Sequence, residues 1–324
     1  MPVSPADPAE AGTYQVRVTS RDLLAEDIVA LRLQPVGDGT LSTYEAGAHV
    51  ELHLPNGMVR QYSLCDAPGG DGYRIAVLRE ASGRGGSTCV HEALREGSEL
   101  RVGTPRNLFP LHPAPHALLL AGGIGITPLM AMAEVLARQG ASFSLHACAR
   151  HRGRAAFFDE LAVKPWASQV HWHLDDGPPE QRLSLERVLA ASPAGSHAWI
   201  CGPDGFIAYA LAACTQAAWS DERVHVERFS ASATDASGTA STGFDVQWAP
   251  TGQVLHVPPE RSVASVLREA GLPVALSCEQ GICGTCLLRV CSGQPEHRDM
   301  FLSAEEQAAN DRFTPCCSRA LSGR

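Results

Sequence analysis

Three closely spaced cysteines constrain this chain more than any other feature of its sequence. Cys278, Cys283 and Cys286 follow the spacing C-x4-C-x2-C, and Cys316 and Cys317 stand further along the chain. Three thiolates from one loop and a fourth from elsewhere are the ligand pattern of a plant-type 2Fe–2S ferredoxin. We therefore expect an iron–sulfur site in the last part of the chain.

The cysteine loop also contains Gly281 and Gly284. Both accept positive φ, which lets a loop curl and bring its backbone N–H groups close to the sulfurs. The alternative is a zinc site or a run of buried free thiols. Zinc sites favour two separated C-x2-C pairs, whereas this sequence has one, so the cluster is the better interpretation.

Composition limits the class of protein. The length of 324 residues implies two or three domains at about 100–200 residues each, and the formal charge of −9 argues against a nucleic-acid binder, which needs a basic face. The apolar stretch 116–137 is interrupted by glycines and Pro128, so we do not expect it to span a membrane. No secretory signal is visible, and an odd number of cysteines, eleven, suits a reducing compartment. We expect a cytoplasmic protein.

Residues 1–111 are expected to form a small antiparallel β-barrel. Apolar and polar side chains alternate with period two at 14–18, 28–35, 49–54, 60–64 and 73–78, which predicts strands. Asn56-Gly57, between two of these, is a hairpin signal because a type I′ turn needs positive φ. Several short antiparallel strands in one span favour a barrel.

Two segments of this region predict a phosphate pocket. Arg60 and Tyr62 share one face of a predicted strand, and Ser63 lies on the other. The glycine-rich turn 83–88 leads into a helix-like stretch at 89–94, and a helix N-terminus with free N–H groups binds anions. Each signal alone is weak, since surface arginines and glycine turns are common. Together, ahead of a nucleotide-binding segment, they predict a flavin phosphate site.

Residues 112–229 alternate strands and helices, which predicts an open, mostly parallel sheet wound on both sides. The buried strand 117–121 ends in a glycine turn, and a helix is expected at 129–139, with Thr127 as N-cap and Pro128 at the first helical position. This order lets a pyrophosphate approach the backbone, although Pro128 replaces the third glycine of G-x-G-x-x-G. Further strands are expected at 142–147, 170–174, 198–201 and 224–229, and further helices at 155–161, 185–191 and 203–218.

The rest of the chain is expected to form a linker and a third domain. Residues 230–243 are small and polar, which is typical of a flexible linker. In 244–324 we expect a hairpin at 244–248 and 253–257 and a helix at 262–270 before the cysteine loop. Ser303 and Glu306 form a capping-box pattern that opens a short helix.

The chain resembles the phthalate dioxygenase reductase family in a series of motifs that occur in the same order. They are RQYSL, GRGGS, GGIGITP, CGP, VERF and CEQGICGTC, followed by HRDMFLSAEEQ and FTPCCSRA. The resemblance covers nearly the whole chain. It implies an FMN-binding β-barrel at 1–111, a doubly wound α/β domain for NADH at 112–229, and a β-grasp ferredoxin domain with a 2Fe–2S cluster at 244–324. It further implies a monomer that passes electrons from NADH to a Rieske-type terminal oxygenase acting on aromatic and related compounds.

The resemblance also implies which residues form the sites. For FMN they are Arg60 at the phosphate, Tyr62 and Ser63 at the isoalloxazine, and Gly85, Gly86 and Ser87 in the phosphate pocket. For the nicotinamide dinucleotide they are Gly122, Gly123, Gly125, Thr127, Cys201, Gly202 and Pro203. The residues implied at the point of hydride transfer are Ser63, Cys201, Glu227 and Phe229.

The cluster ligands implied by the resemblance are Cys278, Cys283, Cys286 and Cys316. Cys316 is preferred because in the family the last ligand stands one residue ahead of the Ser-Arg-Ala run. Cys317 remains the alternative, and Cys291 is expected to be a buried thiol. The chain departs from the family at 321–324, where relatives usually continue into a final strand that closes the ferredoxin sheet, so that sheet edge is in question.

The nicotinamide coenzyme is a separate question. Arg150, Arg152 and Arg154 follow the second strand of the predicted sheet, where an arginine can accommodate a 2′-phosphate. The alternative is a solvated basic turn. We prefer that alternative, and NADH over NADPH, because the family uses NADH.

A flavin can take two electrons as hydride and release them singly, so the predicted relay places FMN between NADH and the cluster. One alternative function is a stand-alone NAD(P)H reductase for small acceptors, and another is a non-enzymatic iron–sulfur redox sensor. The flavin motifs argue against the sensor. A ferredoxin module carried on a flexible linker argues against the stand-alone reductase.

Overall fold

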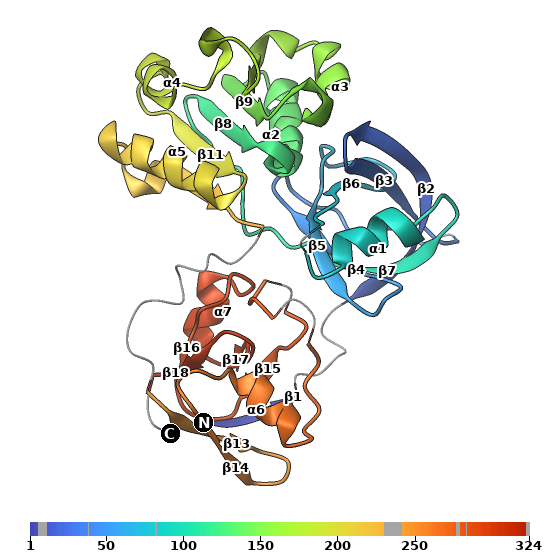
Figure 1. Ribbon diagram of the computed structural model, residues 1–324, viewed down its shortest axis with the longest axis vertical. Coiled ribbons are helices and arrows are strands. Elements are labelled where there is room, and N and C mark those ends of the chain that lie inside the picture. The colour runs from blue at the N-terminus through green and yellow to red at the C-terminus, as the bar shows by residue number, and fades with distance from the viewer. Residues whose placement is uncertain are drawn as a thin grey trace. The chain divides into compact units, whose positions relative to one another are not determined.

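The computed structural model describes residues 1–5, 12–37, 39–81, 83–229, 242–276, 279–282 and 284–321. The chain forms two compact units, drawn in Figure 1. The barrel–sheet unit comprises Thr13–Asn56 and Tyr62–Phe229, and the C-terminal unit comprises Met1–Gly12, Gly57–Gln61 and Ser230–Arg324. Within the described ranges, no helix is both long enough and apolar enough to cross a membrane.

An antiparallel six-stranded sheet forms the barrel. Its strands, in spatial order, are β5 (Val59–Ser63), β4 (His49–His53), β7 (Glu99–Gly103), β2 (Thr13–Ala25), β3 (Ile28–Pro35) and β6 (Tyr73–Leu78). A bridge between Leu64, just after β5, and Ile75 of β6 joins the two edges of the sheet. The predicted β-barrel is therefore confirmed. The helix α1 (Gly86–Ala93) begins three residues earlier than the predicted 89–94.

Strand β2 is longer than the predicted strand 14–18. It continues to Ala25 and pairs with β3 along most of its length. The register shifts between Val18 and Ser20, which marks a β-bulge. A bulge interrupts the period-two alternation. The alternation in the sequence therefore ends at Val18, although the strand continues to Ala25.

Five parallel strands form the second sheet of the same unit. Their order is β10 (Val170–Leu174), β9 (Phe143–Ala149), β8 (Ala117–Gly122), β11 (His197–Cys201) and β12 (Val224–Glu227). The helices are α2 (Ile126–Arg138), α3 (Phe158–Ala162), α4 (Leu185–Ala191) and α5 (Asp204–Gln216). Counted along the chain, the order is 3-2-1-4-5, so the doubly wound fold is confirmed and its topological switch point lies between β8 and β11.

The two faces of this sheet belong to different core clusters. Leu119 and Trp199 pack with Leu129 of α2 on one face, and Leu118 and Ile200 pack in the cluster that contains α4 and α5 on the other. Every residue of β8 is buried, as expected for a strand covered on both sides. The first cluster also includes residues of the barrel, so the barrel and the parallel sheet share one core.

Helix α2 begins earlier than predicted. Its N-cap is Gly125, because the 3-10 turn Gly123–Gly125 runs directly into it. The prediction of Thr127 as N-cap and Pro128 as first helical residue was therefore wrong. Thr127 lies inside the first turn, where its hydroxyl donates a hydrogen bond of 3.0 Å to the Ile124 carbonyl.

A mixed five-stranded sheet organises the C-terminal unit. Its order is β14 (Gln253–Val257), β13 (Phe244–Trp248), β1 (Pro2–Pro5), β15 (Leu288–Val290) and β17 (Arg312–Phe313). A second, two-stranded sheet pairs β16 (Pro295–Glu296) with β18 (Arg319–Ala320). The helices are α6 (Val263–Glu269), capped by Ser262, and α7 (Ala304–Ala309), which has the capping box predicted from Ser303 and Glu306.

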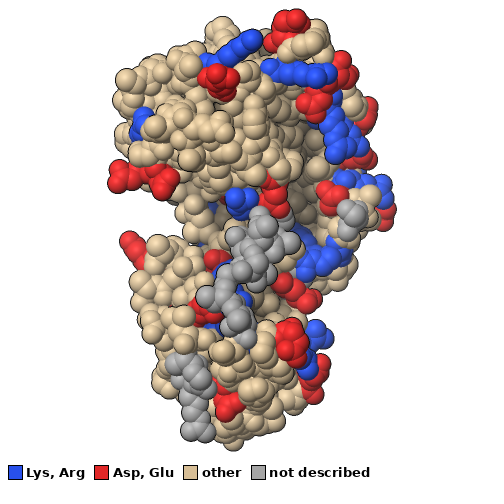
Figure 2. Space-filling view, turned by 60° about the vertical axis from the view of Figure 1, so that its left-hand side comes forward, with Lys and Arg blue, Asp and Glu red and all other residues tan. Residues whose placement is uncertain are grey.

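The first strand of the chain corrects one predicted domain boundary. Residues 1–111 were assigned to the barrel, but β1 lies in the sheet of the C-terminal unit. Most of the predicted linker, 230–241, lies outside the described residues. On the face seen in Figure 2, acidic and basic side chains of the described residues are interspersed, with no broad basic surface of the kind that nucleic-acid binding requires.

Candidate redox site

Glycines draw two turns together at the switch point of the parallel sheet. A Cβ at Gly125 would lie 2.2 Å from the Cys201 carbonyl oxygen, and one at Gly202 would lie 2.9 Å from the Cα of Gly122. Only residues without side chains fit there. The turn after β8 and the turn after β11 therefore pack backbone to backbone, at the sheet edge where such folds bind ligands.

Ser63, Cys201 and Glu227 meet close to this edge. Glu227 ends β12, and its register partner on β11 is Cys201. Ser63, at the end of β5, is buried and forms a side-chain hydrogen bond with Glu227. Three of the four residues predicted at the point of hydride transfer are thus brought together from separate parts of the chain. The fourth, Phe229, lies two residues beyond Glu227 and is 41% exposed.

Burial determines the protonation states of Glu227 and Cys201. It raises the pKa of Glu227 from 4.5 to about 8, although the hydrogen bond with Ser63 acts in the opposite direction. The pKa of the Cys201 thiol lies well above its usual range because the group is buried beside Glu227. Glu227 Oε2 has no hydrogen-bond partner among the described residues. At neutral pH the three side chains therefore include a protonated carboxyl and a thiol, and no described residue forms a hydrogen bond with Glu227 Oε2.

An open glycine turn precedes α1 in the barrel. Gly85 is its N-cap with φ of 89°, and a Cβ there would meet nothing within 4 Å. Asn56, in the β4–β5 turn, donates a hydrogen bond of 3.5 Å to the Gly85 carbonyl, and Ser87 Oγ accepts one of 3.0 Å from the Glu80 N–H. The turn before α1 is thus open on the Cβ side of Gly85 and is held by two hydrogen bonds. Residues of this kind fit a phosphate group.

Ion pairs join the barrel to the parallel sheet within the barrel–sheet unit. Arg74 of β6 makes a two-pronged contact with Glu160 of α3, at 2.8 and 3.1 Å. Arg154 donates to Asp27, at the β2–β3 turn, over 2.7 Å. A bidentate arginine–carboxylate pair fixes orientation as well as distance. The cluster of Ser63, Cys201 and Glu227 is therefore built on two sheets that are fixed to each other.

The cysteine loop is described in part. Cys278 and Cys283 lie outside the described residues, and within the described ranges no group of three potential ligands converges to hold a metal ion. Glu279, Gly281 and Gly284 all have positive φ, at 54°, 71° and 67°. Residues of this conformation turn successive N–H groups to the concave side of a loop, which suits an anionic cluster. The loop residues therefore fit a 2Fe–2S group.

Close packing explains the glycines of this loop. A Cβ at Gly281 would lie 2.4 Å from Cys317 Sγ, and one at Gly284 would lie 2.2 Å from the Phe301 ring. Asp299 also touches the Gly281 position and accepts a hydrogen bond of 2.8 Å from the Leu302 N–H. Neither Asp299 nor Phe301 was predicted as a site residue from the sequence. Both residues belong to the HRDMF segment, which contributed to the family resemblance but was not interpreted residue by residue.

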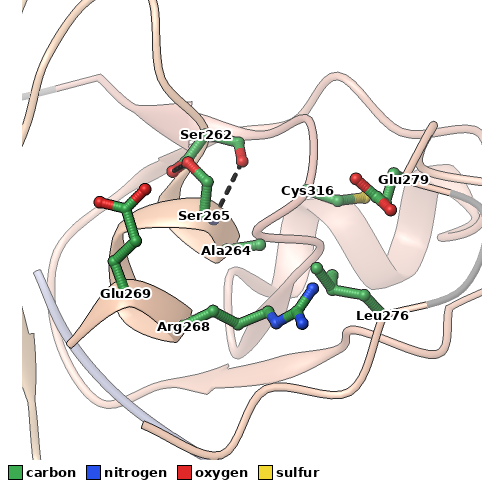
Figure 3. Close-up of a pocket in the computed structure, with 8 residues that line it drawn as sticks. All are labelled: Ser262, Ala264, Ser265, Arg268, Glu269, Leu276, Glu279 and Cys316. Atoms are coloured by element: carbon green, nitrogen blue, oxygen red, sulfur yellow. Dashed lines mark hydrogen bonds between the residues drawn. The ribbon is translucent and has the colours of Figure 1, made fainter. Parts of the chain in front are cut away.

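The two adjacent cysteines differ in their surroundings. Cys316 lines a cavity of about 350 Å³, and Figure 3 shows its side chain next to that of Glu279. Cys317 lies under the loop, with its Sγ 3.3 Å from the Thr314 hydroxyl and 3.8 Å from the Ser318 hydroxyl. The thiol of Cys286 is buried. Cys291 is exposed, so its prediction as a buried thiol was wrong; it follows the last residue of β15 and leaves the core there.

Comparisons with known proteins agree with this architecture. The family described as "2Fe-2S iron-sulfur cluster binding domain" matches residues 246–321. The chain is 47% identical over 310 residues to vanillate O-demethylase oxidoreductase of Pseudomonas sp. (strain HR199 / DSM 7063), covering 95% of this chain and 97% of the relative. It is 37% identical to phthalate dioxygenase reductase of Burkholderia cepacia, covering 97% of both chains.

A solved structure extends the likeness to three dimensions. It is that of phthalate dioxygenase reductase, described as a modular structure for electron transfer from pyridine nucleotides to [2Fe-2S], with a TM-score of 0.72 and 37% identity over 98% of both chains. A flavin-type barrel, a dinucleotide-type sheet and a 2Fe–2S domain in one chain define a nicotinamide-dependent iron–sulfur oxidoreductase. More particularly, this chain belongs to the phthalate dioxygenase reductase family.

Membership in the family confirms several predictions from the sequence. It confirms the resemblance itself, an NADH-dependent flavin iron–sulfur oxidoreductase as the class of enzyme, and FMN, NADH and a 2Fe–2S cluster as the cofactors. The non-enzymatic redox sensor is thereby excluded. The relatives are reductase components of oxygenase systems. The type of oxygenase and the individual site residues stay predictions.

Proposed function

We propose that this protein is the reductase of a Rieske-type oxygenase system and passes electrons from NADH, through FMN and its 2Fe–2S cluster, to a terminal oxygenase for aromatic ring dioxygenation or O-demethylation. The observation that carries the proposal is the contact of Ser63, from the barrel, with Glu227, from the parallel sheet. It joins the predicted flavin pocket to the predicted nicotinamide pocket. Direct hydride transfer requires two such pockets to share a boundary.

The FMN pocket is assigned to the barrel. Arg60 is proposed at the phosphate, with Tyr62 and Ser63 at the isoalloxazine. The proposed phosphate cradle is Gly85, Gly86 and Ser87. Its support is the open start of α1, where a Cβ at Gly85 would meet nothing. The flavin supplies the exchange between one two-electron step and two one-electron steps.

The dinucleotide pocket is assigned to the switch point of the parallel sheet. The proposed residues are Gly122, Gly123, Gly125, Thr127, Cys201, Gly202 and Pro203. Support comes from the close backbone packing of the two turns. It also comes from Gly123, which has a φ of 55° and at which an added Cβ would meet nothing within 4 Å. The hydroxyl of Thr127 already donates a hydrogen bond to the Ile124 carbonyl. Thr127 is therefore proposed to contribute through its position in the first turn of α2.

Three side chains are proposed to shape the point of hydride transfer. Glu227 holds a proton near neutral pH and orients Ser63 through their hydrogen bond. Cys201 keeps its proton and so places no negative charge beside the nicotinamide. Phe229, which is partly exposed, can cover an aromatic ring at the edge of the pocket.

Two of the three arginines after β9, Arg152 and Arg154, form ion pairs within the chain, which supports NADH as the coenzyme; the third, Arg150, is exposed. Arg152 is paired with Asp159 at 2.5 Å and lies 3.7 Å over the Phe158 ring. Arg154 is paired with Asp27 at 2.7 Å. Both guanidinium groups are thus neutralised by carboxylates of the chain. A 2′-phosphate would have to displace these partners, whereas a 2′-hydroxyl would not.

The proposed cluster ligands are Cys278, Cys283, Cys286 and Cys316. Support for Cys316 comes from its place on a cavity beside Glu279 of the cysteine loop. Plant-type clusters have potentials near about −400 mV and Rieske centres lie above about −150 mV. Transfer to a Rieske partner is therefore favourable by roughly four decades in equilibrium constant, at about 59 mV per decade.

Anaerobic reduction tests the proposal. We expect excess NADH to bleach both the flavin and the cluster absorbance of the holoenzyme, and a Rieske oxygenase then to be reduced faster than a small dye at equal concentration. Bleaching of the flavin alone would contradict the relay. Faster reduction of the dye would favour the stand-alone reductase.

A further inference from the structure

Strand β1 occupies the middle of the sheet in the C-terminal unit, although it comes from the opposite end of the chain. It runs parallel to β13, with Val3 opposite Trp248, and antiparallel to β15, with Val3 opposite Val290. The sheet order places β14 and β13 on one side of it and β15 and β17 on the other. Among the described strands, β1 is the element that joins these two pairs.

Backbone hydrogen bonds hold β1 on both sides. The Gln247 and Ala249 N–H groups donate to the carbonyls of Met1 and Val3 at 2.9 and 2.8 Å. On the other side, the Cys291 N–H donates to the Pro2 carbonyl at 2.9 Å. The Met1 ammonium adds a bond of 2.8 Å to the Asp245 carbonyl. Removing β1 would therefore take away the backbone acceptors of Gln247 in β13 and of Ala249 and Cys291, which directly follow β13 and β15.

Side chains of β1 also belong to the core of this unit. Val3 is fully buried and Met1 is 3% exposed, and both pack in the cluster that contains Trp248, Leu288 and Phe313. Burying one such apolar side chain stabilises a fold by about 1.5–3 kcal/mol. The prolines of β1, residues 2 and 5, stand at its ends, where the missing N–H is tolerated. The strand is therefore an integral part of the core.

We propose that the groove between β13 and β15 is a strand-acceptor site whose occupant is residues 2–5 of the same chain, so that the cluster-bearing domain is attached to the barrel by two connections. One connection is the segment after β12, residues 230–243. The other consists of the eight peptide steps from Pro5 to Thr13, which can span at most about 29 Å. The second connection is the shorter one, and it limits how far the cluster domain can move from the barrel during electron delivery.

Cleavage of the longer connection tests this proposal. A specific protease site placed between Phe229 and Thr242 allows the intact holoenzyme to be cut into two fragments after folding. We expect the fragments to co-elute on gel filtration in native buffer, with the cluster absorbance retained, and to separate in urea. Separation in native buffer would overturn the proposal.

Two matched substitutions identify the contact that holds the fragments. Val3→Asp buries a charge in β1 and is expected to weaken the association of the cut fragments at least tenfold. Val254→Asp introduces the same charge on β14, where the valine is about half exposed, and is expected to leave association unchanged. If the Val3→Asp fragments associate as tightly as the wild type, another contact holds them and the proposal fails.

Hydrogen exchange provides a measurement that needs no variant. In the uncut wild-type holoenzyme, the amides of Gln247, Ala249 and Cys291 are expected to exchange as slowly as core amides of the sheet, because their acceptors belong to β1. Exchange of these three amides at the rate of exposed loop amides would show that β1 is not bound, and would overturn the proposal even if Val3→Asp fails to fold.

Discussion

Replacing Glu227 with glutamine should remove a specific pH dependence from the stability of the barrel–sheet unit. The Oε2 atom of its carboxyl group is buried, and burial raises the pKa of Glu227 from 4.5 to about 8. Between these values the folded protein keeps a proton that the unfolded chain releases. Rising pH therefore favours the unfolded state, and the stability that Glu227 provides is present below pH 4.5 and lost as pH rises toward 8. Glutamine has the same shape and does not titrate.

The magnitude follows from the difference of about 3.5 in pKa. At about 1.36 kcal/mol for each unit of pKa, the full loss between pH 4.5 and pH 8 is at most about 5 kcal/mol. Over the accessible range from pH 6 to pH 7.5, the wild type should lose about 2 kcal/mol relative to Glu227→Gln. The amide oxygen of the introduced glutamine can still accept the hydrogen bond from Ser63, so the local packing is preserved.

Urea unfolding of the holoenzyme at a series of pH values measures this difference. Release of FMN, followed by flavin fluorescence, reports on the barrel–sheet unit, and the free energy of unfolding is compared between variants at each pH. Glu222→Gln is the control, because Glu222 is exposed in the same region, and it should follow the wild-type curve. If the free energy of unfolding changes with pH in the same way in the wild type and in Glu227→Gln, the carboxyl of Glu227 does not hold the inferred proton. A wild type that gains stability with pH relative to the variant would show that the carboxyl is ionised in the fold.

Three further substitutions test the separate sites. Cys286→Ser is expected to abolish reduction of the cluster while NADH still bleaches the flavin, and loss of the flavin step in anaerobic stopped flow would contradict this division of roles. Arg60→Ala is expected to release FMN on gel filtration, and full retention of FMN would place the phosphate contact elsewhere. Gly125→Ala places a methyl group 2.2 Å from the Cys201 carbonyl, so the two turns must move apart and the KM for NADH should rise at least about tenfold with FMN still bound; an unchanged KM would show that this turn does not touch the coenzyme.

Much of the local structure followed from sequence pattern. The strands 28–35, 73–78, 170–174, 244–248 and 253–257 and the helix 185–191 have the predicted bounds. Errors occurred where tertiary packing overrode the pattern. The bulge after Val18 hid the second half of β2, and the 3-10 turn before α2 moved the N-cap from Thr127 to Gly125.

The residue types of the redox site were evident from the chain, but their contacts were not. Ser63, Cys201 and Glu227 were each predicted near the point of hydride transfer through family resemblance. That Ser63 and Glu227 share a hydrogen bond, and that burial raises the pKa of Glu227, depend on the barrel and the parallel sheet forming one core. Likewise, Asp299 and Phe301 pack against the cysteine loop from a later segment of the chain.

The sequence by itself determined the chemistry of this protein. The spacing of Cys278, Cys283 and Cys286 and the glycine turns specify an iron–sulfur and nucleotide-binding chain, because thiolate geometry and backbone approach depend on short-range spacing. Only the tertiary structure decided that residues 2–5 complete the sheet of the C-terminal unit. Four residues bounded by prolines carry too short a pattern to specify a partner, and the choice comes from the open backbone groups and core of a domain that begins more than 200 residues later.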